Sequence, residues 1–398
     1  MARLVRSDPA ACAAYWELLC LRMEGDLDVE TLRRALQVVV GRHDALRTRL
    51  APGAFQEVLA SIEVNLPLCE AGGEAAVAEW WRAIAEAPTE LERGPLFRFA
   101  LARTAPGEHL LAFCTHHLVS DGWSIGVLLR EVGAVYGALR EGSAPSLARP
   151  MQFGAWAAEA GRLHAAQAEA HLAYWEGVAR GLAPAEPPRR GSAGEFRGAR
   201  RSLELDGARV GRLRAEGARR GRTLFMTLFG AFTHLLHELC GSAGVVACVS
   251  SAGRGVPGCE GTVGDLAQVL PVVSRRAASL DASVEGASRS LLELYAHQDY
   301  PFALARAHLA RLGLPVPEPV AAFNLDPIAG EPSFAGLRVQ VVPRPVSFVR
   351  RALSFNLLPA PGGALLLDCD YAAGALTPSE IEGATARFIA LLEELAGG

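Results

Sequence analysis

Two patterns of apolar and polar positions alternate along the chain. Over 29–41, apolar side chains recur three and four positions apart, which predicts a helix that Asp28 can cap. Unbroken apolar runs predict buried strands at 96–102 and 109–115. A helical pattern starts again at Ser124, a residue type that commonly caps helices. The first half of the chain therefore mixes helices and strands.

The second half repeats this mixture, so we expect an α/β protein. Across the whole chain, further helices are expected at 74–86, 124–141, 210–219, 224–239, 284–298 and 378–396. Helical stretches are also expected after the helix at 124–141, as far as about residue 181. Further strands are expected at 244–250, 320–325, 337–342, 353–358 and 364–371. Residues 183–200 are rich in proline, glycine and arginine and lack periodicity, which predicts a linker between two domains.

Composition narrows the function classes. The chain has 398 residues, is 50% hydrophobic and 21% charged, and carries a net charge of −4, so no basic field favours nucleic acid. The chain contains no lysine, because every Lys or Arg residue is arginine. This excludes enzymes that depend on a phosphate-loop lysine or on a Schiff-base lysine. No apolar run reaches the roughly 18–20 residues that span a membrane, and the first residues do not resemble a signal peptide. We expect a cytoplasmic protein that binds no membrane.

The eight cysteines are scattered and form no C-x-x-C pair. A disulfide framework or a structural zinc site is therefore not expected. Cys114 and Cys248 lie inside apolar runs and are expected to behave as small buried hydrophobic residues.

A serine in a G-x-S-x-G pattern suggests one alternative chemistry. Ser124 stands in this pattern between a strand and a helix, as a hydrolase nucleophile does. His308 with Asp299 or Asp326 could complete such a triad. The competing interpretation is that Ser124 only caps the helix.

Two further patterns have simpler interpretations. Residues 253–258 fit G-x-G-x-x-G, but Pro257 opposes the helix that a dinucleotide site needs, so a turn is favoured. His234 and His237 have metal-ligand spacing on an apolar helix, yet no third ligand lies nearby in sequence. We therefore expect packed histidines and no metal.

The polar stretch after residue 115 concentrates chemically active side chains. Because side chains alternate along a strand, His116 and His117 are expected to point to opposite faces, so that only one can face a given cavity. Histidine exchanges protons near neutral pH, so that ring is a candidate general base. Asp121, if buried, needs a partner, preferably arginine. Gly122 leaves room for a substrate or for backbone to approach closely.

These residues lie within a longer resemblance. The pattern His116-His117-x-x-x-Asp121-Gly122 resembles the signature of the condensation domains of nonribosomal peptide synthetases, which belong to the chloramphenicol acetyltransferase-like superfamily. The resemblance covers about residues 13–396 in collinear order. Its other matching segments are 25–50, 93–101, 174–184, 222–241, 297–302 and 321–326.

The resemblance implies a fold and a domain division. It implies two chloramphenicol acetyltransferase-like lobes that form a V-shaped pseudo-dimer with a central tunnel. The N-terminal lobe is expected at 1–182 and carries the histidine motif. The C-terminal lobe is expected at 183–398 and carries a floor loop and a bridging segment.

The resemblance also implies roles for individual residues. His117 is expected to accept a proton from, or to orient, the attacking amine, while His116 packs inward. Asp121 is expected to form a structural ion pair with Arg254 of the second lobe, and Gly122 to line the acceptor side. The residues assigned to substrate binding are Trp123, Ser124, Asn324 and Gln268.

Members of this family join two acyl groups that carrier proteins hold as phosphopantetheine thioesters. We therefore expect an acyltransferase that forms an amide between a donor thioester and an acceptor amine. Its partners are expected to be donor and acceptor peptidyl carrier proteins and adenylation domains of the same synthetase, and the chain itself is expected to bind no cofactor. Two alternatives stay open: a stand-alone acyltransferase that uses a free alcohol or amine, and an inactive carrier-binding fragment.

Two departures from the family pattern bear on activity. The family's opening motif, with its serine, glutamine and tryptophan, has no counterpart, so the chain is expected to begin late relative to the family. The family's floor-loop motif appears as VGDLAQVLPVV over 263–273, with Gln268 in place of asparagine. We expect this segment to be a loop.

Overall fold

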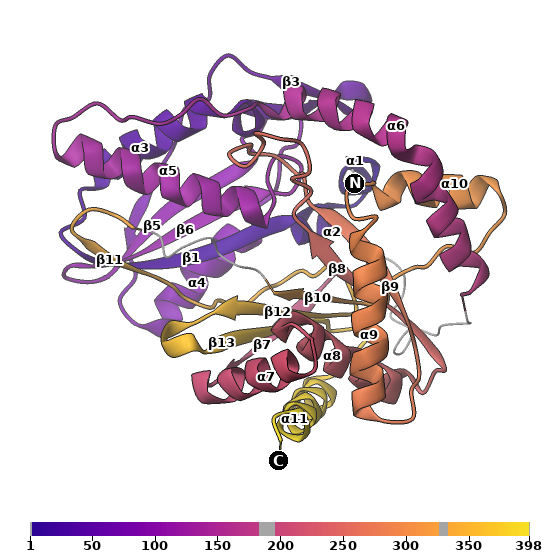
Figure 1. Cartoon of the computed structure of the whole chain (residues 1–398). Helices are drawn as coiled ribbons and strands as arrows, with labels where there is room; N and C mark the ends of the chain where they lie inside the picture. The colour runs from indigo at the N-terminus through magenta and orange to yellow at the C-terminus, as the bar shows by residue number, and fades with distance from the viewer. Residues whose placement is uncertain (1, 183–195, 326–332, 398) are drawn as a thin grey trace. The chain divides into compact units, whose positions relative to one another are not determined.

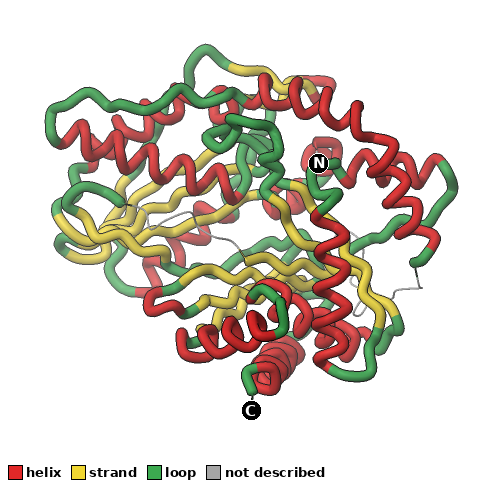
Figure 2. Tube along the Cα trace, in the orientation of Figure 1, coloured by secondary structure: helices red, strands yellow, loops and turns green. Residues whose placement is uncertain are grey.

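The computed structural model describes residues 2–182, 196–325 and 333–397 (Figure 1). These residues form two compact units, each built from three stretches of the chain. The first unit comprises Met1–Glu159, Arg254–Leu266 and Ile328–Phe348. The second comprises Ala160–Gly253, Ala267–Pro327 and Val349–Gly398. Both units mix helices and strands (Figure 2).

The first unit is built on a five-stranded sheet and a separate two-stranded hairpin. Its strands are β1 Trp16–Gly25, β2 Thr48–Ala51, β3 Phe55–Val58, β4 Leu68–Glu70, β5 Phe97–Ala105, β6 Glu108–His116 and β11 Leu337–Val341. Its helices are α1 Ala2–Ser7, α2 Pro9–Ala14, α3 Val29–Arg42, α4 Glu74–Ala85, α5 Gly122–Arg140 and the short 3₁₀ helices η1 Asp44–Arg47 and η2 Pro52–Ala54. The sheet order is β11-β1-β6-β5-β4, which places β6 at the centre, antiparallel to both neighbours.

Helices cover both faces of this sheet. On one face, Leu111 and Phe113 of β6 belong to a core that α3 and α5 complete (Figure 1). On the other face, Ala112 and Cys114 pack in a second core with Trp81 of α4. Because β6 is buried on both sides, its sequence is an apolar run rather than an alternating pattern. This burial places the end of β6, at the histidine pair, in a closely packed part of the unit.

The second unit is built on a six-stranded sheet. Its strands are β7 Gly198–Leu205, β8 Gly244–Ser251, β9 Gln268–Arg275, β10 Ala321–Leu325, β12 Leu353–Pro359 and β13 Leu365–Ala372. Its helices are α7 Gly207–Arg219, α8 Leu224–Cys240, α9 Leu280–Tyr295, α10 Phe302–Arg311, α11 Pro378–Leu395, the 3₁₀ helix η3 Pro361–Gly363, and most of α6 Phe153–Arg180, which begins in the first unit. The order is β7-β13-β12-β10-β8-β9, and β10 runs parallel to β8 and β12.

The two faces of this second sheet differ in character. On one face, Phe323 and Phe355 pack against Phe232 of α8, with ring centroids 5.1 and 4.9 Å apart. The next residue of each strand, Asn324 and Asn356, points to the opposite face because side chains alternate. One face of the sheet is therefore apolar core and the other carries polar side chains.

Several elements differ from the sequence predictions. The predicted linker 183–200 is wrong at its end, because 198–200 belong to β7, whose Arg200 pairs with Asp370 of β13. Residues 183–195 lie outside the described residues, so the domain boundary at 182 stays a prediction. The predicted floor loop at 263–273 is also wrong from Gln268 onward, because these residues pair with β8 as strand β9.

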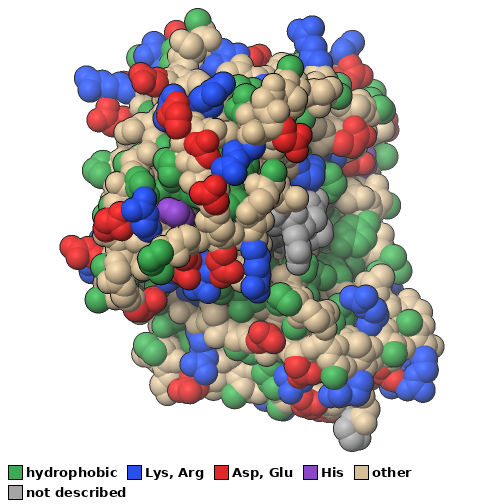
Figure 3. Space-filling view, turned by 90° about the vertical axis from the view of Figure 1, so that its left-hand side faces the viewer, with side chains coloured by type: hydrophobic (Ala, Val, Ile, Leu, Met, Phe, Trp, Pro, Cys, Tyr) green, Lys and Arg blue, Asp and Glu red, His purple; other side chains and the backbone are tan. Residues whose placement is uncertain are grey.

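The surface matches the mixed composition. Acidic and basic side chains are interspersed over the face drawn in Figure 3. Within the described part of the chain, no helix is both long and apolar enough to cross a membrane.

Candidate functional site

The histidine motif occupies the turn between β6 and α5. His116 is the last residue of β6, where it pairs with Trp16 of β1. The backbone N–H of His117 donates to the carbonyl oxygen of Tyr15 at 2.8 Å, so the residue just before β1 also fixes the first residue of the turn. Helix α5 then begins at Gly122. The site is thus anchored on the central strands of the first sheet.

His116 is a packed residue whose hydrogen bonds determine its tautomer. Its side chain is fully buried, and the Leu118 backbone N–H donates to His116 Nδ1 at 3.1 Å. Because Nδ1 accepts, the ring proton sits on Nε2, which lies 3.2 Å from the carbonyl oxygen of Cys12. The ring also meets Trp16 edge-on at 5.4 Å. His116 therefore supports the strand end, as its predicted inward packing requires.

His117 lies between two carboxylates. Its Nε2 is 2.5 Å from Oε1 of Glu17, and its Nδ1 is 3.4 Å from Oδ1 of Asp265. The residue is 8% exposed, whereas both acidic side chains are about a quarter exposed, at 28% and 26%. A neutral imidazole has one N–H and can donate to only one of these groups, whereas the imidazolium can donate to both. The site is therefore suited to a ring that gains and loses a proton.

Asp121 links helix α5 to the segment 254–266. Its Oδ1 accepts from the backbone N–H of Ser124 at 2.8 Å, which makes Asp121 the N-cap of α5. Its Oδ2 accepts from the backbone N–H of Leu266 at 2.9 Å. The guanidinium of Arg254 lies across both carboxylate oxygens, at 3.0 and 3.1 Å. Removing one partner of such a buried pair typically costs roughly 3–5 kcal/mol.

Two expectations are corrected by these contacts. Ser124 is not the cap of α5, because the carboxylate of Asp121 precedes the helix and accepts from the backbone N–H of Ser124. Arg254 is not contributed by a second lobe, because 254–266 pack within the same compact unit as Asp121. The pair therefore stabilises the turn within one unit.

Ser124 serves the same linkage and is fully buried. Its hydroxyl lies 2.7 Å from Asp121 Oδ1, 2.9 Å from the carbonyl oxygen of Gly264 and 3.2 Å from an Arg254 nitrogen. A buried hydroxyl engaged in this way is not presented to a substrate. This corrects both the nucleophile hypothesis and the assignment of Ser124 to substrate binding.

Gly122 and Trp123 are the exposed residues of the turn. A Cβ added at Gly122 meets no heavy atom within 4 Å, so the position is open. The indole of Trp123 is 37% exposed, donates to the carbonyl oxygen of Glu260 at 2.9 Å and lies 5.6 Å from the guanidinium of Arg254. Both residues remain candidates for substrate contact.

The other two candidates for substrate binding belong to the second unit. Asn324 lies in β10 and donates from Nδ2 to Oδ1 of Asn356 at 2.9 Å. Gln268 is the first residue of β9 and is partly exposed. Their roles stay predictions.

The remaining sequence motifs have structural explanations. Residues 253–258 form a turn in which Gly253 and Gly258 have φ of 64° and 80°, and no helix follows. His234 bonds to the hydroxyl of Ser283 at 2.9 Å, and His237 bonds to the carbonyl oxygen of Ser242 at 3.0 Å.

The histidine of the proposed hydrolase triad and the two cysteines in apolar runs can also be compared with the structure. His308 bonds at 2.9 Å to Glu176, a residue that the hydrolase hypothesis did not name. Asp326, one of the two aspartates that it did name, lies outside the described residues. Cys114 and Cys248 are both buried, as predicted. Burial raises the pKa of Cys114 to about 12, which removes thiolate chemistry at neutral pH.

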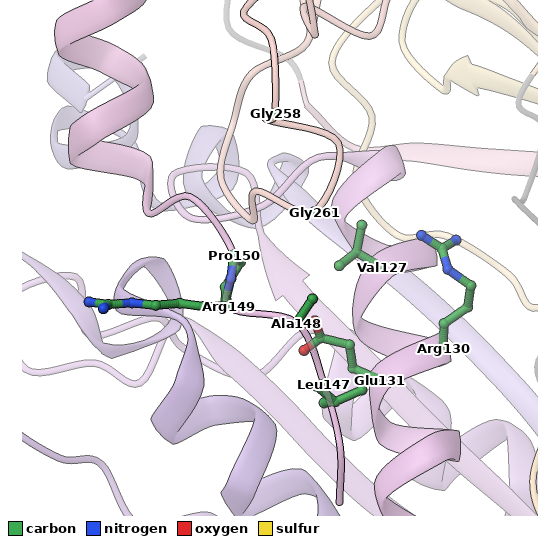
Figure 4. Close-up of a pocket in the computed structure, with 9 residues that line it drawn as sticks. All are labelled: Val127, Arg130, Glu131, Leu147, Ala148, Arg149, Pro150, Gly258 and Gly261. Carbon is green, nitrogen blue, oxygen red and sulfur yellow. The ribbon is translucent and has the colours of Figure 1, made fainter.

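A pocket of about 280 Å³ lies beside the site without including it (Figure 4). It is lined by α5, by 147–150 and by the glycines of the 258–261 turn. Glu131 on its wall accepts hydrogen bonds from Arg42 at 3.1 Å and from His43 at 2.8 Å. None of the motif residues lines this pocket, so we assign it no part in the candidate site.

Sequence reasoning missed Glu17 and Asp265. Glu17 lies in β1, a strand that the apolar pattern did not predict, and it reaches His117 only because β1 pairs with β6. Asp265 lies in the segment 254–266, whose packing against the turn is a tertiary event. The one available signal was an acidic residue within the apolar stretch WELLCL, where a carboxylate has to find a partner.

Comparisons with known proteins identify the family of the chain. A family model described as "Condensation domain" matches residues 10–398. Surfactin synthase subunit 1 of Bacillus subtilis (strain 168) is 30% identical over 296 residues, and the chondramide synthase of Chondromyces crocatus is 32% identical over 312 residues. These alignments cover 70% and 73% of this chain but only 8% of each of the two synthases.

Solved structures give the same fold. The first condensation domain of the calcium-dependent antibiotic synthetase, in complex with a substrate analogue, has a TM-score of 0.86 at 23% identity, covering 99% of this chain and 93% of that one. The X-domain from teicoplanin biosynthesis has a TM-score of 0.83 at 23% identity, covering 100% and 94%. The mixed α/β fold expected from the resemblance is confirmed, and the V-shaped arrangement stays a prediction. The chain belongs to the condensation-domain family of nonribosomal peptide synthetases, whose members are acyltransferases that form amide bonds.

Proposed function

We propose that the chain joins a donor acyl or peptidyl thioester to the amine of an acceptor aminoacyl thioester, both held on carrier proteins. The observation that carries the proposal is His117, a nearly buried imidazole with a carboxylate at each ring nitrogen. The partners are a donor and an acceptor peptidyl carrier protein, and the phosphopantetheine arms belong to them. Adenylation domains of the same synthetase would load both carriers, and the reaction would take place in the cytoplasm.

The proposed reaction exchanges one bond for another. The acceptor nitrogen attacks the thioester carbonyl carbon, the new C–N bond forms, and the C–S bond breaks. The nitrogen loses a proton and the departing sulfur gains one. His117 is the group that takes the proton or orients the amine, and a general base contributes on the order of 10²–10⁴-fold. Placing amine and thioester together supplies much of the rest.

The turn supports this role by holding His117 still. Asp121, Arg254 and Ser124 form a buried network that fixes the start of α5 to 254–266. Asp265, on that segment, is thereby held beside the ring. Gly122 leaves open space at the first turn of the helix.

Replacing His117 tests the proposal. His117→Ala is expected to abolish amide formation between loaded donor and acceptor carriers, measured by mass spectrometry of the acceptor carrier. Ser124→Ala is the matched control, because its hydroxyl is buried in the same turn. Losing those hydrogen bonds is expected to lower stability by about 1–3 kcal/mol while product still forms at a temperature at which the variant is folded.

The outcomes separate the alternatives. Loss of product in Ser124→Ala with retention in His117→Ala would contradict the proposal and favour a hydrolase. Product with a free alcohol or amine, and none with the carrier-bound acceptor, would favour the stand-alone acyltransferase. Carrier binding without any product would favour an inactive carrier-binding fragment.

A further inference from the structure

A chain of hydrogen bonds crosses four strands on the polar face of the second sheet. Arg200 of β7 holds Asp370 of β13 with two bonds, Nε to Oδ1 at 2.6 Å and Nη2 to Oδ2 at 2.8 Å. Asn356 of β12 donates from Nδ2 to Asp370 Oδ2 at 3.1 Å. Asn324 of β10 donates from Nδ2 to Asn356 Oδ1 at 2.9 Å. The strand register makes this possible by placing Arg200 opposite Asp370 and Asn324 beside Asn356.

The ion pair determines the direction of every bond in this chain. An amide side chain has a donor on one arm and an acceptor on the other, and its partners decide its orientation. The carboxylate of Asp370, held by Arg200, can only accept, so Asn356 has to turn its NH₂ group toward it. Asn356 then presents its oxygen to Asn324, which turns its own NH₂ group to meet it. As a result, the side-chain carbonyl oxygen of Asn324 points away from this series of hydrogen bonds.

Among the described residues, that oxygen is the one amide oxygen in a set of thirteen buried side-chain nitrogen and oxygen atoms that have no hydrogen-bond partner. Asn324 Oδ1 is buried and accepts no hydrogen bond from the residues that the structure describes. Buried polar atoms without a partner are rare in folded proteins, and each one needs an explanation. Asn324 is also the second-last residue of β10, which lies between two parallel neighbours. The carboxyl ends of parallel strands are where such sheets commonly bind ligands.

We propose that Asn324 Oδ1 accepts a hydrogen bond from an amide N–H of a phosphopantetheine thioester. Arg200, Asp370 and Asn356 are positioning residues that hold the Asn324 amide in this orientation. The inference rests on the proposed function, because that function brings the ligand: a phosphopantetheine arm contains two amide N–H groups between its phosphate and its sulfur. The carbonyl oxygen at 324 distinguishes this arm from one that offers only acceptors at the same position.

Substituting the donor atom in the ligand tests the hydrogen bond. Three stable pantetheine thioether analogues are compared, the parent diamide and two analogues in which one or the other amide N–H is replaced by an ester oxygen. Their dissociation constants for the full chain are measured by calorimetry. One ester analogue is expected to bind about ten- to a hundredfold more weakly than the parent. Asn324→Leu is expected to bind the parent and that analogue equally.

A matched pair of variants tests the positioning role. Asp370→Asn removes the acceptor-only end, so that Asn356 can turn either way and the discrimination between parent and ester falls severalfold. Asp368→Asn is the control, because Asp368 also binds Arg200, at 2.9 Å, and the hydroxyl of Ser202, at 2.5 Å, but is not bonded to Asn356. It is expected to retain the discrimination. Thermal melts of both variants show whether each is folded.

The proposal is overturned if both ester analogues bind the wild-type chain as tightly as the parent, or if no analogue binds. It is also overturned if Asn324→Leu retains the discrimination. Amide formation is measured separately with loaded carriers. Discrimination without product therefore supports the hydrogen bond at Asn324 while contradicting the proposed reaction.

Discussion

At the scale of single residues, the chemistry that we propose for His117 depends on acids from elsewhere in the chain. Glu17 lies 2.5 Å from Nε2, so it is placed to stabilise a positive charge that develops on the ring. Asp265 is 3.4 Å from the other nitrogen. Under the proposed function, these two acids would stabilise the imidazolium that forms when His117 takes a proton from a substrate.

Removing the charge of Glu17 should reveal this role. Glu17→Gln keeps an oxygen that can accept from Nε2 but no longer balances an imidazolium, so we expect kcat to fall by at least about tenfold with little change in KM. Glu24→Gln is the matched control on the same strand, where Glu24 pairs with the exposed Arg338 at 3.6 Å. Steady-state rates of amide formation check the prediction, and equal rates for the two variants contradict it.

The residues of the motif could be predicted from sequence, but the acids around them could not. His117, Asp121 and Gly122 stand within six positions, and their residue types alone indicate proton transfer and close approach. Arg254 was found through the family resemblance. Glu17 and Asp265 meet His117 only after β1 pairs with β6 and 254–266 folds over the turn, and no local pattern encodes these events.

At the scale of elements, helix α5 is positioned by close packing as well as by its cap. A Cβ built at Gly133 would lie 2.1 Å from the carbonyl oxygen of Ser333, so the helix can approach this backbone only because the residue is glycine. The approach brings the segment before β11 against the middle of α5. The same helix starts at Asp121, so its placement affects the candidate site.

Filling this contact should destabilise the protein. Gly133→Ala is expected to lower the free energy of unfolding by about 1–3 kcal/mol, because the helix or the segment has to move. Gly161→Ala is the control, since that helical position meets nothing within 4 Å and alanine favours helix by up to about 1 kcal/mol. Urea unfolding followed by circular dichroism measures both. A loss of stability in both variants contradicts the packing argument.

Elements with a clear period were predictable, and those defined by pairing were not. The helix over 29–41 has a strong apolar stripe and an aspartate cap, and α3 follows it. Strand β1 was missed because its apolar start turns into alternating residues, and its partners β6 and β11 lie far along the chain. The cap of α5 was misassigned by three residues because Asp121 and Ser124 are both good caps, and only the buried contacts of Asp121 decide between them.

At the scale of the whole molecule, a pair of histidines links stability to pH. His171 of α6 and His297 after α9 approach Nδ1 to Nδ1 at 2.9 Å, so one proton is shared between two rings. Burial lowers the pKa of both, and the neighbouring charge of His171 lowers that of His297 further, while Asp299 opposes the shift at His171. The folded state therefore binds protons less readily than the unfolded chain, whose histidines titrate near about pH 6.5.

Stability from this pair is complete above about pH 6.5 and is lost as the pH falls through the lower pKa of the folded state. We expect the Tm of the wild-type protein to drop between pH 7.5 and pH 5, and His171→Gln to show a smaller drop. His308→Gln is the control, because that ring bonds to Glu176 instead of another histidine. Calorimetry across this range checks the expectation, which an equal drop in wild type and His171→Gln contradicts.

The periodicity of the sequence does not predict how the chain divides into compact units. A single boundary near residue 182 treats each unit as one continuous piece, whereas the described residues of 254–266 and 333–348 pack with the first unit. Local patterns describe residues that are neighbours along the chain. The unit that each of these segments joins depends instead on the surfaces that the segment buries when the chain folds.

The divided first unit has a consequence for biosynthesis. A ribosome makes Asp121 long before Arg254 leaves the exit tunnel, and it makes β1 long before β11 is available to cover its edge. The nascent chain therefore carries an acid without its arginine partner through about a third of its translation and an open strand edge through more than half of it. The first unit reaches its final form only when residues up to 348 have emerged.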